Sequence, residues 1–155
     1  MANFTATVDS PVGCFGVRGT EAGVTEILLP SDQPRASAGR APTPVAAAAR
    51  QLAQYLAGER RTFDVTLAEV EATDFQRDVW AALSEIPYGE VRTYAEVAAA
   101  VGRPLAARAV GNANHRNPWP VVVPCHRVVA ADGLGGYGGG DTVKRYLLGL
   151  EGVSR

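Results

Sequence analysis

Apolar and polar positions alternate over short runs in the first thirty residues, which is typical of β-strands. Three runs, "FTATV", "CFGVRG" and "GVTEILL", are rich in β-forming residues, and turn residues in "DSPVG" and "GTEAG" separate them. The pattern predicts an antiparallel meander. The segment that follows, "PSDQPRASAGRAPT", is rich in Pro, Ser, Gly and Ala and predicts a mobile loop.

Helical spacing follows this loop. Thr43 is suited to the N-cap of a helix and Pro44 to its first position, and Gly58 is suited to its end. The apolar stripe of this helix consists of Val45, Leu52, Tyr55 and Leu56. Beyond it, "FDVTLAEV" alternates well enough to predict a further strand over residues 63–70.

From residue 73 onward the hydrophobic spacing is mainly helical. Thr73 and Thr93 are each followed three residues later by Gln or Glu, and each pair predicts a capping box at the start of a helix. Gly102 can close the second helix in the left-handed conformation, and Pro104 can open the next. Two short helices so closely joined predict a helix-turn-helix. We therefore expect two subdomains, residues 1–72 and 73–155, in a mixed α/β fold of the α+β type.

Composition places the chain among ordinary globular proteins, with 155 residues of which 46% are hydrophobic and 20% charged. No stretch approaches the ~20 apolar residues of a membrane span, and the N-terminus does not resemble a signal peptide. A cytoplasmic location and no membrane association are the expectations. A net charge of −1 argues against a strongly basic protein that binds nucleic acids nonspecifically.

Charge is nevertheless unevenly distributed along the chain. No carboxylate lies between Glu96 and Asp132, whereas four arginines and both histidines do, which predicts a locally positive surface. Within this interval, "LAARAVGNA" surrounds Arg108 with small residues. Such a helix can approach either a neighbouring helix or a DNA groove closely, and the missing carboxylates favour DNA.

The segment "VVVPCHRVVAADG" places one of two cysteines, Cys125, beside one of two histidines, His126. Adjacent side chains of an extended chain point to opposite faces, so a kink after Pro124 or a bridging water is needed to couple the two. A thiol of pKa ~8.5 is only slightly ionised at neutral pH, and His126, Arg127 or a carboxylate could activate it. A buried, inert cysteine is the alternative, and it explains Cys14 better.

Six segments carry a resemblance to a known family. In order, they are "IPYGE" with a following Tyr, "ARAVGNA", "NP", "PCHRVV", "GYGGG" and "KRYLLGLEG". Together they resemble the O6-alkylguanine-DNA alkyltransferase family, nearly without gaps from about residue 73 to 152. This resemblance implies a winged-helix-like helix-turn-helix in the second half. The first half is similar only in layout, as a ribonuclease-H-like small antiparallel sheet with a helix.

The resemblance also implies a reaction. The Cys125 thiolate would take the alkyl group from guanine O6 in duplex DNA and keep it, so that each molecule reacts once. By position, His126 resembles the base that deprotonates the thiol through a water, and Glu151 the carboxylate that orients the imidazole. Asn117 resembles the residue that holds the active-site turn. Tyr94 resembles the one that crowds a phosphate and donates to the flipped base.

Roles in DNA binding and in the pocket follow in the same way. Arg108 resembles the finger that replaces the flipped nucleotide, on a helix whose small residues suit the minor groove. Those small residues are Ala106, Ala107 and Ala109. The pocket residues implied are Val128, Tyr137, Gly138 and Pro120, with the bulky Trp119 able to narrow the entrance. The implied partner is double-stranded DNA containing O6-alkylguanine, with O4-alkylthymine as an additional expected substrate. We expect no cofactor or metal and a monomeric free protein.

Other classes of function remain as alternatives. A zinc site built from both cysteines and both histidines would have a spacing that fits no common ligand pattern. The segment "GLGGYG" fits a dinucleotide-binding pattern, but too little chain follows for the rest of that motif. A DNA-binding module without catalysis would not need Cys125. A thiol hydrolase would not explain the small-residue helix around Arg108.

Overall fold

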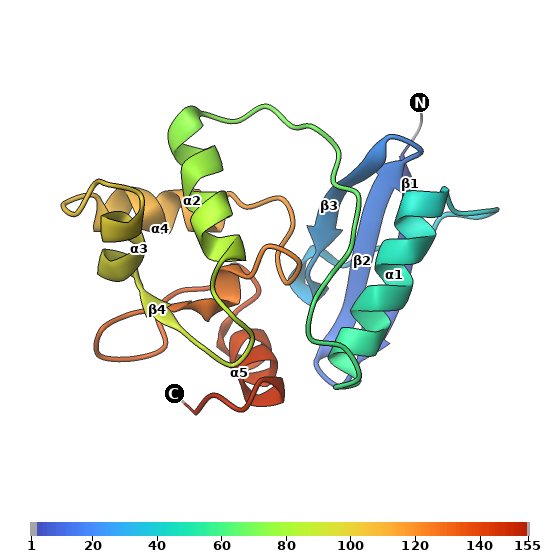
Figure 1. Cartoon of the computed structure of the whole chain (residues 1–155). Helices are drawn as coiled ribbons and strands as arrows, with labels where there is room; N and C mark the ends of the chain where they lie inside the picture. Colours follow the sequence, from blue (N-terminus) through green and yellow to red (C-terminus); the bar gives the residue numbers. More distant parts are fainter. Residues whose placement is uncertain (1–2, 155) are drawn as a thin grey trace. The chain divides into compact units, whose positions relative to one another are not determined.

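The computed structural model describes residues 3–154 (Figure 1). Contacts divide the chain into two compact units. The first contains the chain up to Val70 together with Pro118–Val122, and the second contains Glu71–Asn117 and the chain from Val123 onward. Residues 118–122 thus belong to the first unit although they come late in the chain. The sequence predicted only a single boundary at residue 72.

The first unit contains a three-stranded antiparallel sheet in the order β1-β2-β3. Its strands are β1 (Phe4–Ser10), β2 (Gly13–Thr20) and β3 (Gly23–Leu28), so the predicted meander is confirmed. Gly23 begins β3 with a φ of 140°. A Cβ at this position would lie 2.7 Å from the Ala68 nitrogen, so the close approach of residues 66–68 requires glycine.

Helix α1 (Thr43–Leu56) packs against all three strands (Figure 1). A short 3-10 turn, η1 (Pro30–Asp32), follows β3 along the chain and precedes α1. The predicted apolar stripe is confirmed, since Val45, Leu52 and Tyr55 are fully buried. The helix begins at Thr43 and Pro42 occupies the cap position, so the prediction of Thr43 as N-cap was wrong by one residue.

The strand predicted over residues 63–70 does not form. Only Leu67 makes a bridge, parallel to Val24, through hydrogen bonds that flank it on either side. The Ile27 amide further along this edge of β3 is already occupied, because it donates to the Pro118 carbonyl. The Val24 carbonyl itself accepts both the Ala68 amide and the Trp119 indole. Little of the edge is left for a longer ladder.

The second unit is mainly helical, and two of the expected helix starts are confirmed. It contains α2 (Asp74–Ser84), α3 (Tyr94–Ala100), α4 (Ala107–His115) and α5 (Asp141–Leu150), with short parallel strands β4 (Arg92–Thr93) and β5 (Val128–Val129). Thr73 caps α2 and Thr93 caps α3, each accepting a hydrogen bond of 3.1 Å from the third backbone amide of its helix. Gly102 follows α3 with a φ of 77°, as predicted.

Helices α3 and α4 form the expected pair, and both α2 and α3 pack against α4. Pro104 does not open α4. The helix begins at Ala107, because a turn closed by the hydrogen bond from the Ala106 amide to the Arg103 carbonyl comes first. The Trp80 indole of α2 donates to the Ala113 carbonyl of α4 at 2.9 Å, which joins these helices in the core. Among the described residues, no helix is long and apolar enough to cross a membrane.

Candidate active site

Cys125 and His126 lie in a single 3-10 turn, η2 (Cys125–Arg127), rather than in an extended chain. Pro124 precedes this turn, and the Arg127 amide donates to the Pro124 carbonyl at 3.0 Å. Successive side chains in a 3-10 helix point about 120° apart, so the thiol and the imidazole leave the turn in different directions. The kink expected after Pro124 is thus present as a helical turn.

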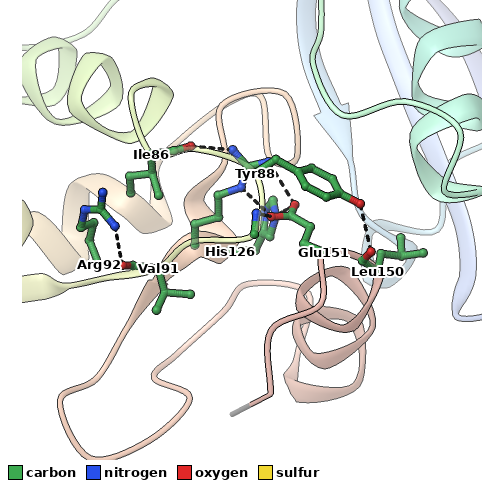
Figure 2. Close-up of polar contacts among 9 residues, drawn as sticks. Ile86, Tyr88, Val91, Arg92, His126, Leu150 and Glu151 are labelled. Atoms are coloured by element: carbon green, nitrogen blue, oxygen red, sulfur yellow. Dashed lines mark hydrogen bonds and ion pairs between the residues drawn. The ribbon is translucent and has the colours of Figure 1, made fainter.

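The imidazole of His126 is fully buried and contacts Glu151, which caps the C-terminus of α5 (Figure 2). His126 Nε2 lies 2.8 Å from Glu151 Oε2, and Glu151 Oε1 accepts the Gly89 amide at 3.0 Å. A carboxylate can only accept, so we infer that Nε2 carries the proton. Nδ1 is then the ring nitrogen that can accept a proton from another group.

Arg127 holds the same carboxylate. Its Nε donates to Glu151 Oε1 at 2.8 Å and its Nη2 to Oε2 at 3.1 Å, while Nη1 donates to the Ile86 carbonyl at 2.7 Å. The guanidinium carbon lies 5.7 Å from the centre of the Tyr88 ring, whose hydroxyl donates to the Leu150 carbonyl (Figure 2). Sequence reasoning considered Arg127 only as an activator of the thiol and missed this pairing.

Burial dominates the proton affinities of the site. It lowers the pKa of His126, and Arg127 and Lys144 lower it further, while Glu151 raises it. The imidazole is therefore neutral near physiological pH and able to accept a proton. Burial raises the pKa of the Cys125 thiol, although Asn117, Lys144 and Tyr137 act in the opposite direction. The resting cysteine is accordingly a thiol that needs a base.

Lys144, the chain's only lysine, is fully buried on α5. Its ammonium donates to the Val128 carbonyl at 2.7 Å and to the Gly136 carbonyl at 3.1 Å, so it joins β5 to the glycine-rich segment before α5. Burial lowers its pKa to about 8. Lys144 was not among the site residues predicted from the sequence. The signal was present, because Lys144 lies within the apolar stripe formed by Val143, Leu147 and Leu148.

Two asparagines hold the backbone around the cysteine. The Asn117 amide donates to the Val123 carbonyl at 2.8 Å, and the Asn114 amide donates to the Cys125 carbonyl at 3.3 Å. Asn117 thus contacts the segment that it was expected to hold, and Asn114 is an addition that sequence reasoning did not provide.

Of the expected pocket residues, Val128, Tyr137 and Gly138 belong to the second unit and Pro120 to the first. Tyr94 begins α3 and its hydroxyl donates to the Gly136 carbonyl at 3.5 Å, while the half-buried Tyr137 and the exposed Gly138 belong to the same glycine-rich segment. Val128 is buried in β5. The Trp119 ring in the first unit is also buried, and its indole donates to the Val24 carbonyl of β3.

The residues expected to contact DNA lie together at the start of α4. Arg108 and Ala109 are exposed, and Ala106 and Ala107 are partly exposed. Leu105, directly before them, is completely exposed. Among the described residues, no group of three or more His, Cys, Asp or Glu is placed to hold a metal ion. Cys14 lies on β2, in the first unit.

Comparison with known proteins assigns the chain to a family. Residues 74–153 match the family described as "6-O-methylguanine DNA methyltransferase, DNA binding domain". A methylated-DNA–protein-cysteine methyltransferase of Mycolicibacterium paratuberculosis is 46% identical over 157 residues, which cover 94% of this chain and 90% of the relative. The chain belongs to this methyltransferase family. The resemblance found from the sequence motifs is thereby confirmed.

Other members of the methyltransferase family support the assignment over different lengths. The methylated-DNA–protein-cysteine methyltransferase of Methanosarcina acetivorans is 58% identical over 106 residues, 68% of this chain and 67% of the relative. A crystal structure of Mycobacterium tuberculosis OGT in complex with DNA has a TM-score of 0.83 and 44% identity, and the match covers 96% of this chain and 92% of that chain. The expected mixed α/β fold is confirmed by this likeness.

Proposed function

We propose that this protein repairs DNA by transferring an alkyl group from O6 of guanine in duplex DNA to Sγ of its own Cys125. The observation that carries the proposal is the placement of the cysteine in a turn whose next side chain, His126, is bound to Glu151 at 2.8 Å. Relatives over most of the chain are named methylated-DNA–protein-cysteine methyltransferases, and one solved relative is in complex with DNA.

In the proposed reaction, Nδ1 of neutral His126 removes the thiol proton of Cys125 through a bridging water. Glu151 stabilises the resulting imidazolium through Nε2. The thiolate attacks the alkyl carbon, so that a carbon–sulfur bond forms as the carbon–oxygen bond breaks. The electron pair of the broken bond stays on guanine, which takes up the proton and remains in the DNA as unmodified guanine. The thioether is stable, and each molecule therefore reacts once.

Access to O6 requires that the base leave the duplex, at a cost of a few kcal/mol. We assign minor-groove binding to the start of α4, where Ala106, Ala107 and Ala109 permit close approach, and the filling of the vacated stack to Arg108. Tyr94 donates to the flipped base and crowds its phosphate.

The flipped base is proposed to lie against Val128, Tyr137 and Gly138, which all belong to the second unit. Asn117 holds the turn that presents the cysteine. O4-alkylthymine is the second proposed substrate, since its alkyl–oxygen bond offers the same electrophilic carbon.

The direct test uses a duplex with labelled O6-methylguanine, followed by mapping of the label on the protein. Wild type and Cys14→Ser are expected to take up the label, and Cys125→Ser to bind the duplex without transfer, because a hydroxyl is a far weaker nucleophile at neutral pH. Cys14 is a matched control because it is the chain's other cysteine. Transfer by Cys125→Ser, or binding without transfer by wild type, would contradict the proposal.

Base flipping is tested separately from the chemistry. Arg108→Ala is expected to slow single-turnover transfer from a paired duplex while leaving the reaction with free O6-methylguanine unchanged, because only the duplex requires extrusion. An arginine that only contacts phosphate would instead weaken binding of all duplexes and reduce its salt dependence. An equal fractional loss on both substrates would contradict the role of Arg108 in flipping.

A further inference from the structure

Two side chains share the carboxylate of Glu151. His126 contacts Oε2 through Nε2 at 2.8 Å, and Arg127 contacts both oxygens, at 2.8 Å and 3.1 Å. The Gly89 amide adds a fourth donor at 3.0 Å. All of this is buried, since the side chains of His126 and Glu151 have no exposed surface and that of Arg127 is 8% exposed.

Arg127 cannot easily withdraw from this arrangement. Its third nitrogen, Nη1, donates to the Ile86 carbonyl at 2.7 Å, and the guanidinium carbon lies 5.7 Å from the centre of the Tyr88 ring. Its planar donors match both carboxylate oxygens, which a single ammonium group could not do. The cation is therefore a fixed part of the site.

The charges around His126 explain what such a cation does. A buried carboxylate beside an imidazole favours the protonated ring, because the imidazolium compensates its charge. Arg127 already provides that compensation. Lys144 on α5 adds a second positive charge that disfavours imidazolium, and the neighbouring Cys125 is a neutral thiol at rest. The ring can then stay neutral although it is bound to a carboxylate.

We propose that Arg127 is a positioning residue for alkyl transfer, one that shares Glu151 with His126 and so keeps the imidazole available as a proton acceptor. The proposal rests on the function proposed above. In this arrangement, Arg127 compensates the negative charge of the Glu151 carboxylate before the reaction begins. Glu151 then orients the ring and stabilises the imidazolium formed during transfer, without drawing a proton onto the ring beforehand.

Removal of Arg127 has a predictable effect on the pair that remains. In Arg127→Met, the uncompensated carboxylate and the imidazole together take up one proton at higher pH than in wild type. The direction is the same whether that proton resides on His126 or on Glu151, because both forms neutralise a buried negative charge. Arg127→Lys keeps the positive charge and is expected to lie near wild type.

The histidine content makes a direct measurement possible. The chain has only two histidines, and His115 is exposed, so ring-15N labelling gives one buried and one exposed reference signal. In wild type at pH 7, His126 is expected to be neutral with its proton on Nε2. Its titration midpoint is expected to rise by about one to three pH units in Arg127→Met and to stay close to wild type in Arg127→Lys. The acid limb of the transfer rate should shift in parallel.

Three results would overturn the proposal. One is a charged His126, or a proton on Nδ1, in wild type at pH 7, and this holds even if Arg127→Met does not fold. Another is an unchanged His126 midpoint in folded Arg127→Met, and the third is an equal shift in Met and Lys variants. The titration uses no DNA, so a failure of alkyl transfer and a failure of this proposal are separately visible.

Discussion

Lys144→Met changes one buried group and leaves a side chain of similar length. The ammonium that it removes donates to the Val128 and Gly136 carbonyls and is fully buried. Burial lowers the pKa of this lysine from 10.5 to about 8. Both proteins are compared in a Cys125→Ser background, so that the nearby thiol does not titrate in the same range.

The size of the effect follows from this pKa. Between pH 8 and pH 10.5 the native lysine is neutral while the unfolded one is charged, so the unfolded state binds more protons and the free energy of unfolding rises with pH. The rise is at most about 1.4 kcal/mol per pH unit, and about 2–3 kcal/mol over the whole range. Lys144→Met lacks this contribution. Its stability relative to the parent should therefore fall as the pH increases.

Two assays measure this. Urea denaturation followed by far-UV circular dichroism from pH 7 to pH 10.5 gives the difference in unfolding free energy between the two proteins. Because Lys144 is the only lysine, lysine labelled at 13Cε gives a single side-chain signal whose midpoint is expected at about 8. A difference in stability that does not change with pH, together with a midpoint at the ordinary value for lysine, would refute the reasoning.

Other variants test separate contributions to stability, each by urea denaturation at pH 7. Glu151→Gln is expected to lower the free energy of unfolding by about 3–5 kcal/mol because it leaves Arg127 buried without its carboxylate. Adding Arg127→Met should restore most of the lost free energy. A double variant as unstable as Glu151→Gln would argue against a charge effect. Gly102→Ala should cost about 1–2 kcal/mol through its φ of 77°, whereas Gly133→Ala, also in open space but without a positive φ, serves as control. Thr73→Ala should cost about 1 kcal/mol by removing the cap of α2, and an unchanged stability would exclude that role.

Local sequence signals predicted the elements whose structure is decided locally. The capping boxes at Thr73 and Thr93 are satisfied by the side chain and backbone of the same turn, so their sequence is sufficient to place α2 and α3. The three-stranded meander depends on turns between neighbouring strands. By contrast, the strand predicted around Leu67 failed because a distant segment, at Pro118 and Trp119, occupies part of the same sheet edge.

The candidate site likewise contains some residues that the sequence predicted and others that it did not. Cys125, His126 and Glu151 could be named from sequence motifs, and the structure brings the last two into contact. The partners of Arg127 and Lys144 could not be predicted from the sequence, because they are a carboxylate and backbone carbonyls from other elements. A charged residue within an apolar stripe is a detectable signal for such a group. Its partner is known only once the chain has folded.

The most direct test of the central claim is the amount and the position of the transferred group. Wild-type protein is mixed with an excess of duplex containing O6-methylguanine, and the products are measured by intact mass and by peptide mapping. One methyl group per protein molecule, on Cys125, with an equal amount of unmodified guanine restored in the duplex, is the predicted result. Repeated turnover, or a methyl group on any other residue, would contradict the claim.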